Sequence, residues 1–288
     1  MKYCSRCLLP ETQETINFDK NGVCNVCQNW ETKNSKDWVA QKEKLTGIAN
    51  RHRRTDGSWD CIVPFSGGKD SAFTVYYVVE ELGLEPLLVT FDHGFFKEQT
   101  LANVEKIIDK YGLGQVKVKL GDRVQKNVML ESLRRKGDFC WHCHCGCFST
   151  PMNIAVEQEI PLVIWGEPSA EYTSYYNYKT EEVVDEKRFN RFVNLGITVE
   201  DMVGMTDTSD SFIEYLKYPP VKDLTKIGCE SICLGSYIPW DTEKQSNLIA
   251  NKLDWVGGGC EGIPPRYWYE KVECKYTGVR DYPKYIKR

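Results

Sequence analysis

One short stretch constrains this chain more than any other, a glycine-rich turn between an apolar strand and an apolar helix. The apolar run at residues 61–65 (CIVPF) ends in Ser66-Gly67-Gly68-Lys69-Asp70-Ser71, and apolar residues resume at Ala72. A glycine-rich turn that opens a helix points backbone N–H groups at an anion, and the helix dipole adds to the attraction. The sequence therefore predicts a phosphate site at residues 66–71.

The residue types in this turn suit a phosphate. The two glycines allow close approach to the backbone, Lys69 supplies a positive charge, and Ser66 and Ser71 supply hydroxyl donors. Asp70 suits either a magnesium ion or the N-terminus of the helix, and the sequence leaves both interpretations open. The Walker A spacing is absent, so the turn differs from the phosphate loop of the common kinases and GTPases.

From residue 58 onward, short apolar segments alternate with helical ones. We expect strands at residues 61–65, 86–92, 115–120 and 161–166, and helices at 70–83, 98–112, 122–137, 211–218 and 243–255. Short apolar strands separated by helices of this length predict an α/β fold with a doubly wound parallel sheet. By pattern the chain divides into an N-terminal cysteine-rich part (1–35), a connecting helix (36–57), a nucleotide-binding domain (58–170) and a C-terminal substrate or partner region (171–288).

Residues that directly follow a strand face the ligand in a doubly wound sheet. Asp92 and His93 follow the second expected strand, and we weigh a nucleotide or substrate role against a role in the turn. Glu167 follows a later strand and is a candidate for magnesium or substrate.

Four N-terminal cysteines are spaced as in a zinc ribbon. Cys4 and Cys7 form one Cys-x-x-Cys pair, and Cys24 and Cys27 form a second after a linker of sixteen residues. Four thiolates in two such pairs suit tetrahedral Zn²⁺. The role is expected to be structural, because so few apolar residues cannot build a core without metal.

Composition excludes some partners. The net charge of -4 predicts no general attraction to nucleic acid, and no apolar run is long enough to span a membrane. The first residues lack an apolar signal region, so we expect a cytoplasmic protein. Thirteen cysteines in that compartment indicate metal sites or reactive thiols rather than disulfides.

The SGGKDS turn after the first strand resembles the PP-loop of the ATP pyrophosphatase superfamily, whose sheet is of the HUP type. This resemblance implies that the loop holds the pyrophosphate end of ATP while a substrate oxygen attacks the α-phosphate. Lys69 and Ser66, with Ser71, would neutralise the departing pyrophosphate. Lys69, Ser66 and Asp70 are the catalytic candidates, and residues 66–71 are the ATP-binding candidates with Asp92 and Glu167.

Further patches resemble the N-acetyl sugar amidotransferases, which act in surface-polysaccharide and pseudaminic- or legionaminic-type sugar biosynthesis. They are CSRCLLPET, GVCNVCQN, WDCIVPFSGGKDS, PLLVTFDHG, CGCFSTPMNIA, IWGEPSAEY and LGSYIPWD, in this order. The resemblance implies a two-step reaction on an acetamido sugar, which is expected to be nucleotide-linked. The acetamido oxygen is adenylylated by ATP, with Mg²⁺, and ammonia then displaces AMP to leave an acetamidino group.

The ammonia source is expected to be another protein. Cys260, in GGCEG, matches a glutaminase elbow, but such a nucleophile needs a histidine base, and no histidine follows it in the sequence. We therefore interpret residues 257–262 as a loop. The family resemblance implies a separate glutaminase and an ammonia-channelling partner.

A second cysteine group lies at residues 140–147, between the helix after the third strand and the next helix. Cys140 and Cys143 match the pair that holds a [4Fe-4S] cluster in some thiolases of the superfamily, with Cys233, or else Cys229, as a third ligand. A zinc site and free thiols remain open. Two other functions also stay open: a tRNA thiolase, and a non-enzymatic zinc-ribbon adaptor with a degenerate nucleotide domain.

Overall fold

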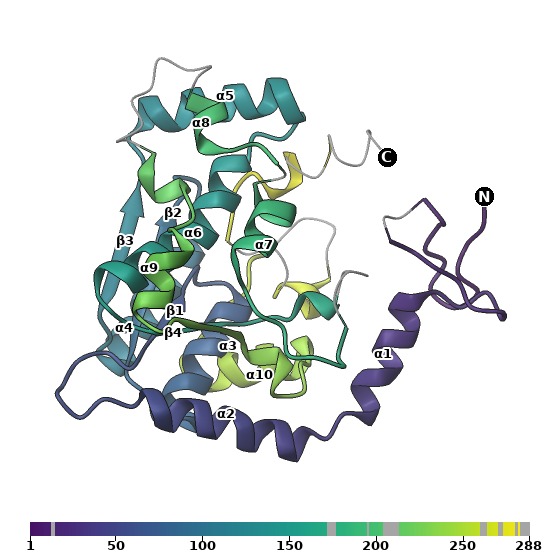
Figure 1. Cartoon of the computed structure of the whole chain (residues 1–288), viewed down its shortest axis with the longest axis horizontal. Helices are drawn as coiled ribbons and strands as arrows, with labels where there is room; N and C mark the ends of the chain where they lie inside the picture. Colours follow the sequence, from purple (N-terminus) through teal and green to yellow (C-terminus); the bar gives the residue numbers. More distant parts are fainter. Residues whose placement is uncertain are drawn as a thin grey trace.

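A five-stranded parallel sheet forms the centre of the molecule (Figure 1). The computed structural model describes the whole chain except residues 13–14, 172–176, 195, 204–212, 260–263, 270–272, 280–281 and 283–288. The strands, in the spatial order β3-β2-β1-β4-β5, are β1 (Cys61–Pro64), β2 (Pro86–Asp92), β3 (Gln115–Lys119), β4 (Leu162–Trp165) and β5 (Glu230–Cys233). The predicted α/β fold with a doubly wound parallel sheet is confirmed.

Helices connect and cover these strands. They are α1 (Asn25–Ser35), α2 (Trp38–His52), α3 (Lys69–Tyr76), α4 (Glu98–Tyr111), α5 (Asp122–Lys136), α6 (Trp141–Glu157), α7 (Glu186–Arg188), α8 (Val199–Val203), α9 (Val221–Lys226) and α10 (Thr242–Leu253). Helix α3 continues into a π-helical turn at Tyr77–Glu81, so the helical stretch ends two residues before the predicted range 70–83 does. Helix α4 ends at Gly112, which adopts the left-handed conformation that favours glycine at a helix end. None of the described helices is both long and apolar enough to cross a membrane.

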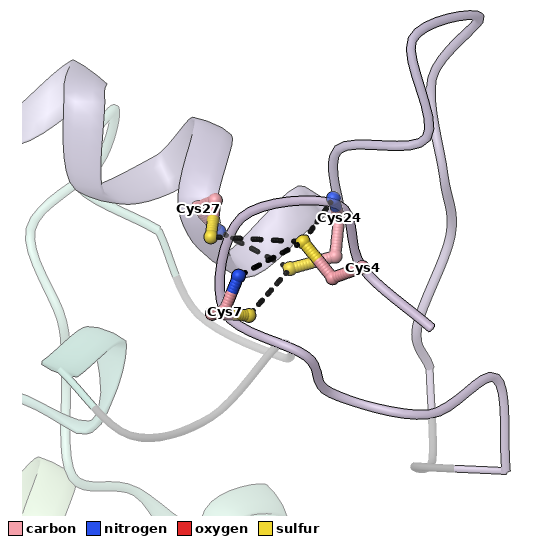
Figure 2. Close-up of side chains that lie close together, drawn as sticks. All are labelled: Cys4, Cys7, Cys24 and Cys27. Carbon is pink, nitrogen blue, oxygen red and sulfur yellow. Dashed lines mark hydrogen bonds between the residues drawn. The ribbon is translucent and has the colours of Figure 1, made fainter. Parts of the chain in front are cut away.

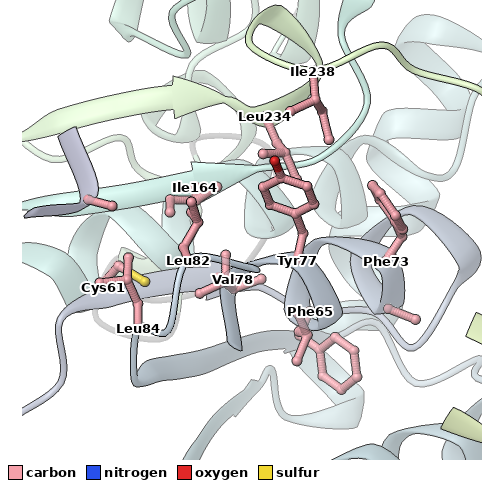
Figure 3. Packing of buried hydrophobic residues seen from close by; sticks show 14 of the residues in the cluster. Cys61, Phe65, Phe73, Tyr77, Val78, Leu82, Leu84, Ile164, Leu234 and Ile238 are labelled. Carbon is pink, nitrogen blue, oxygen red and sulfur yellow. The ribbon is translucent and has the colours of Figure 1, made fainter. Parts of the chain in front are cut away.

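The sheet is buried on both faces, which explains why its strands read as continuous apolar runs. Successive residues of a strand point to opposite faces. In β1, Cys61 and Val63 pack with helices α2, α3, α4 and α10, while Ile62 packs with α6 and α9 on the other face. Figure 3 shows part of the first core, where Phe73 of α3, Tyr77 of the π-helical turn and Ile164 of β4 belong to one cluster of buried side chains. Helices therefore form one layer on each side of the sheet.

The strand order reverses beside β1. The chain runs from β1 outward through β2 to β3, and then crosses to β4 on the opposite side of β1. Loops that leave β1 and β4 at their carboxyl ends diverge at such a switch point and leave a crevice for a ligand. The glycine turn leaves β1, and the segment that carries Glu167 leaves β4, so both lie at this edge.

Three segments differ from expectation. The mid-chain cysteines lie in the first turns of α6 rather than between helices, a helix that also contains Pro151. The expected helix at 211–218 is a 3₁₀ turn at Glu214–Leu216, with residues 211–212 outside the described part. Strand β5, which the sequence pattern did not predict, completes the sheet beside β4.

The cysteine-rich N-terminus lies at one end of the molecule, joined to the sheet domain by α1 and α2 (Figure 1). Lysines from this region anchor it: Lys33 Nζ donates to the Trp240 carbonyl at 2.6 Å and Lys36 Nζ to the Ser236 carbonyl at 2.9 Å. Helix α2 also buries Leu45 in the main core.

Candidate active site

The glycine turn is held in shape by its own hydroxyl groups. Gly67 has a φ of +79°, in the left-handed region. Ser66 N donates to Ser71 Oγ at 3.2 Å, and Ser71 Oγ donates to the Gly68 carbonyl at 3.2 Å. Gly68 N donates to Ser66 Oγ at 3.3 Å. The turn is therefore a closed loop at the start of α3, with its backbone fixed before any ligand binds.

The lysine of the turn is paired with its neighbour. Lys69 Nζ lies 2.7 Å from Asp70 Oδ2, and the two side chains are 12% and 26% exposed. Asp70 also lies in the first turn of α3, where a carboxylate is favoured by the helix dipole. A polyphosphate that binds here must compete with Asp70 for the ammonium group.

Residues from two elements that are distant in the sequence contact the glycine turn. A Cβ on Gly67 would lie 2.6 Å from Val104 Cγ2 and 3.0 Å from the Thr100 carbonyl, both in α4. Trp255 Nε1, just after α10, donates to the Gly67 carbonyl at 3.0 Å. These contacts fix the position of the turn. Trp255 was missed by sequence reasoning, because nothing local links it to a residue so far away in the chain.

A cavity of about 430 Å³ opens in front of the turn at the carboxyl edge of the sheet. Ser66 and Asp70 line one wall. Aromatic side chains line much of the remainder, namely Phe65, Phe91, Phe96, Phe148 and Trp165. The rings of Phe148 and Trp165 are stacked, with centroids 5.0 Å apart. The cavity thus combines a polar phosphate wall with apolar walls that limit access of water.

A larger hollow lies elsewhere on the described surface. It measures about 1330 Å³ and lies between α1, α2 and α10, lined by residues such as Trp30, Trp38 and Leu248. It contains none of the residues of the glycine turn. The smaller cavity is the better candidate site, because it lies at the switch point and Ser66, Asp70 and His93 line it, although Lys69, Asp92 and Glu167 are not part of its lining.

Asp92, at the end of β2, and His93, which follows it, differ from each other in their contacts. Asp92 accepts from Gly94 N at 2.8 Å and pairs with Lys117 Nζ at 3.1 Å. Burial raises the pKa of Asp92, but these two partners outweigh it and hold the pKa below its usual value. His93 lines the cavity, is 5% exposed, and accepts from Phe95 N at 3.1 Å through Nδ1. Burial lowers the pKa of His93, which favours the neutral imidazole.

The segment after β4 is held by a buried ionic network. The Arg188 guanidinium pairs with the Glu182 carboxylate, and the two side chains are 7% and 3% exposed. Arg188 also donates to Ser169 Oγ at 2.6 Å, and Glu182 accepts from Ser169 N at 2.7 Å. Both charged side chains therefore fix Ser169, two residues after Glu167. Neither Arg188 nor Glu182 was singled out from the sequence, because they lie in a region of weak pattern.

Thiols reach the cavity from two parts of the chain. Cys143 and Cys147, one turn apart on α6, line it together with Cys274 from the C-terminal region. Cys140 is the N-cap residue of α6 and is buried. Cys233 is fully buried at the end of β5, where its Sγ donates to the Gly166 carbonyl at 3.2 Å, and burial raises its pKa well above the usual value.

The cluster ligand set of Cys140, Cys143 and Cys233 therefore stays a prediction. Among the described residues, the N-terminal cysteines alone bring three or more donor atoms within 4.8 Å of one another. Cys229, the alternative third ligand, is partly buried, and burial raises its pKa to about 11. Cys260, considered as a glutaminase nucleophile, lies outside the described residues.

The four N-terminal cysteines form a compact thiol group (Figure 2). Cys4 Sγ lies 3.9 Å from Cys27 Sγ, and Cys7 Sγ lies 3.5 Å from Cys24 Sγ. Four sulfurs around tetrahedral zinc, at Zn–S distances of about 2.3 Å, are separated by about 3.8 Å. The spacing is compatible with a zinc ribbon.

Backbone hydrogen bonds stabilise the thiolate form of Cys4. Cys4 Sγ accepts from the N–H groups of Arg6, Cys7 and Cys24 at 3.4, 3.5 and 3.2 Å. Burial raises the pKa of Cys4, but these N–H donors outweigh it and bring the pKa to about 6. The thiolate is the form that binds metal, so these donors favour the ligand state of Cys4, whereas burial raises the pKa of Cys24 and of Cys27.

Comparison with known proteins gives limited similarity. No protein-family model matches the chain. An uncharacterized protein of Methanocaldococcus jannaschii is 25% identical over 141 residues, and the match spans 49% of this chain and 50% of that protein. The chain thus aligns with about half the length of this relative.

Two solved structures share elements of the fold. The U34-tRNA thiolase NcsA from Methanococcus maripaludis, with its [4Fe-4S] cluster, gives a TM-score of 0.40 at 13% identity, over 99% of this chain and 83% of that chain. The NMN synthetase from Francisella tularensis gives a TM-score of 0.35 at 10% identity, over 85% of this chain and 96% of that chain. Similarities at this level do not bear on function.

Proposed function

We propose that this chain is an ATP-dependent amidotransferase of the PP-loop superfamily that converts the acetamido group of an N-acetyl sugar into an acetamidino group. The observation that carries the proposal is the preformed turn at residues 66–71, which opens into a mostly apolar cavity at the switch point of the sheet. The product would serve surface-glycan biosynthesis, and the enzyme would act in the cytoplasm.

In the first step, the acetamido oxygen attacks the α-phosphorus of ATP, and the bond to the bridging oxygen of pyrophosphate breaks. Negative charge grows on the leaving pyrophosphate, where the N–H groups of the turn, the Ser66 hydroxyl and the Lys69 ammonium group stabilise it. Lys69, which pairs with Asp70 at 2.7 Å, would be released to the phosphates if Asp70 held a cation. Asp70, with Glu167, would hold Mg²⁺, which supplies charge neutralisation at the phosphates.

In the second step, ammonia attacks the imidate carbon and AMP leaves with the former acetamido oxygen. An amide oxygen is a poor leaving group, and its conversion to AMP makes this displacement feasible. The aromatic walls of the cavity favour ammonia over water by excluding bulk solvent from the adenylylated intermediate. His93 lines the cavity as a neutral imidazole whose Nδ1 already accepts from Phe95 N, so its Nε2–H would donate a hydrogen bond to the substrate.

The sugar would enter through a second cavity of about 680 Å³ that lies between α5 and the C-terminal region. Phe95, Phe139 and Tyr276 line it, with Lys119 and Lys126. Aromatic faces suit a sugar or a base, and the two lysines suit the diphosphate of a nucleotide-linked sugar.

Ammonia would come from a separate glutaminase through a channelling partner. The purified chain is therefore expected to use ammonium ions but not glutamine, because no histidine follows Cys260 in the sequence. Glutamine hydrolysis by this chain alone, abolished in Cys260→Ala, would contradict this source of ammonia.

A second candidate is a tRNA thiolase, which the thiols of the cavity favour. Cys143, Cys147 and Cys274 lie beside the phosphate turn, where a sulfur carrier or a cluster would meet an adenylylated base. The net charge of -4 favours the sugar substrate instead, because RNA binding relies on positive charge.

The proposal is tested by incubating the purified protein with ATP, ammonium chloride and a panel of nucleotide-linked acetamido sugars. We expect AMP and pyrophosphate to form only with an acetamido acceptor, together with an acetamidino sugar detected by mass spectrometry. The matched control is the same nucleotide sugar with a hydroxyl in place of the acetamido group. AMP formation that depends on unmodified tRNA and a sulfur donor, and not on any sugar, would select the thiolase instead.

A further inference from the structure

The C-terminal strap, which we define as residues 273–279, crosses the carboxyl edge of the sheet beside the phosphate turn. It lies antiparallel to the segment after β2, with Phe96 opposite Cys274. Lys97 N donates to the Glu273 carbonyl at 3.3 Å, and Lys275 N donates to the Phe95 carbonyl at 2.9 Å. The strap thus reaches the site from almost the far end of the chain.

The first residue of the strap occupies space directly against the turn. A Cβ on Gly68 would lie 2.5 Å from Glu273 Cδ and 2.8 Å from Glu273 Cγ, so the glutamate side chain lies against the Gly68 backbone. Glu273, Ser66 and Asp70 line the same cavity. The carboxylate therefore lies where a phosphate group would have to approach the glycines.

In this arrangement, the charged side chains that line the cavity oppose the binding of ATP. Its described lining includes the carboxylates of Asp70 and Glu273 and neither lysine nor arginine. Lys69, the nearest cation of the turn, is already paired with Asp70. A polyphosphate would meet two like charges at close range, and such contacts oppose binding.

The strap also separates two hollows. Glu273, Cys274 and Thr277 line the cavity in front of the turn. Tyr276 and Val279 line the second cavity beside α5. Movement of the strap away from the turn would join the two cavities into one cleft, which a reaction between two substrates requires.

We propose that the C-terminal strap is a gate that ATP opens, with Glu273 as an anionic occupant of the phosphate turn when the strap is closed. This inference rests on the proposed function to the extent that ATP is the ligand of the turn. When the triphosphate binds, it displaces the Glu273 carboxylate from Gly68, the strap leaves the edge of the sheet, and the acceptor cavity becomes continuous with the nucleotide cavity.

The attachment of the strap suits a gate. Two backbone hydrogen bonds hold it in place, together with edge-to-face contacts of Tyr276 with Phe95 and Phe139, at 4.7 and 6.3 Å between centroids. Tyr276 remains 42% exposed and Val279 56% exposed. Segments with few buried contacts open at low free-energy cost, so a ligand of ordinary affinity can displace this one.

The test compares the affinity for MgATP, by calorimetry, of the full-length wild-type protein and three variants. We expect Glu273→Gln to bind MgATP more tightly than wild type by about tenfold, since the competing closed state loses its charge. Tyr276→Ala, which weakens the strap without touching the turn, should also tighten binding. Glu105→Gln, an exposed carboxylate on α4, is the matched control and should leave the affinity unchanged.

A second readout follows the strap itself. A non-hydrolysable ATP analogue should accelerate tryptic cleavage after Lys275 in the wild-type protein, because the strap is released. Equal or weaker MgATP binding by both Glu273→Gln and Tyr276→Ala would overturn the gate while leaving ATP binding intact. Absence of MgATP binding in wild type and in every variant would overturn the proposed function as well.

Discussion

Replacement of Gly67 by alanine tests whether helix α4, which packs against the glycine turn, constrains the conformation of the turn. An L-residue at a φ of +79° costs about 1–2 kcal/mol in the left-handed region. The new Cβ would also lie 2.6 Å from Val104 Cγ2 and 3.0 Å from the Thr100 carbonyl. Overpacking of this kind costs about 1–3 kcal/mol. We therefore expect Gly67→Ala to lower the free energy of unfolding by about 2–5 kcal/mol, the sum of these two terms.

Gly112 provides a matched control for the backbone term. It has a φ of +65° at the end of α4, and a Cβ there would meet no atom within 4 Å. Gly112→Ala should lose only about 1–2 kcal/mol. Urea denaturation followed by far-UV circular dichroism gives both free energies of unfolding. The reasoning would be refuted if Gly67→Ala proved no less stable than Gly112→Ala, since α4 would then exert no constraint on the turn.

A third variant separates steric contact from strain. Val104→Ala removes the atom nearest to the new Cβ but leaves the Thr100 carbonyl and the positive φ. The double variant Gly67→Ala, Val104→Ala should therefore lose less stability than the sum of the two single variants. MgATP affinity should fall in Gly67→Ala in either background, because the turn is displaced from the geometry in which Ser66 and Ser71 hold it closed.

Further predictions concern the catalytic turn and the two cysteine groups. Lys69→Ala and Ser66→Ala should each slow AMP formation at least about a hundredfold with unchanged circular dichroism, because each removes a group that stabilises charge on the leaving pyrophosphate. AMP formation at the wild-type rate in either variant would contradict the assignment of the turn. Lys110→Ala serves as a control. Cys24→Ser should lower the zinc content, measured by elemental analysis, from about one ion per chain, because it removes one of four ligands. Anaerobic purification should give a brown protein with about four irons and four sulfides per chain, lost in Cys143→Ala, if a cluster is bound. A colourless anaerobic protein with zinc alone would exclude the cluster.

The sheet and the turn were predictable because their signals are local. Strands β1, β2 and β4 are buried on both faces and are therefore short apolar runs in the sequence. Residues 66–71 combine glycine, lysine and serine at the start of a helix. This combination predicts a phosphate site without knowledge of the residues that pack around it. The cysteine pairs of the N-terminus have the spacing of zinc ligands, and their sulfurs do lie close together.

The remaining parts of the site depend on contacts between distant residues. Trp255 and Glu273 lie against Gly67 and Gly68 only because the C-terminal region folds back over the sheet edge. Strand β5 has four residues, ESIC, and its mixed composition gave no strand signal. The first turns of α6 are so rich in cysteine and histidine that, with Pro151 further on, they did not read as a helix. In each case tertiary packing decided the outcome rather than local propensity.

The central claim is that the turn directs an attack by the acetamido oxygen on the α-phosphate of ATP. The most direct measurement uses an acceptor sugar whose acetamido oxygen is heavy-oxygen labelled, with ammonium and ATP, followed by mass spectrometry of the nucleotide products. We expect the label to be transferred to the phosphate of AMP and the pyrophosphate to remain unlabelled. Formation of ADP with label in inorganic phosphate, or of unlabelled AMP alongside an acetamidino product, would contradict it.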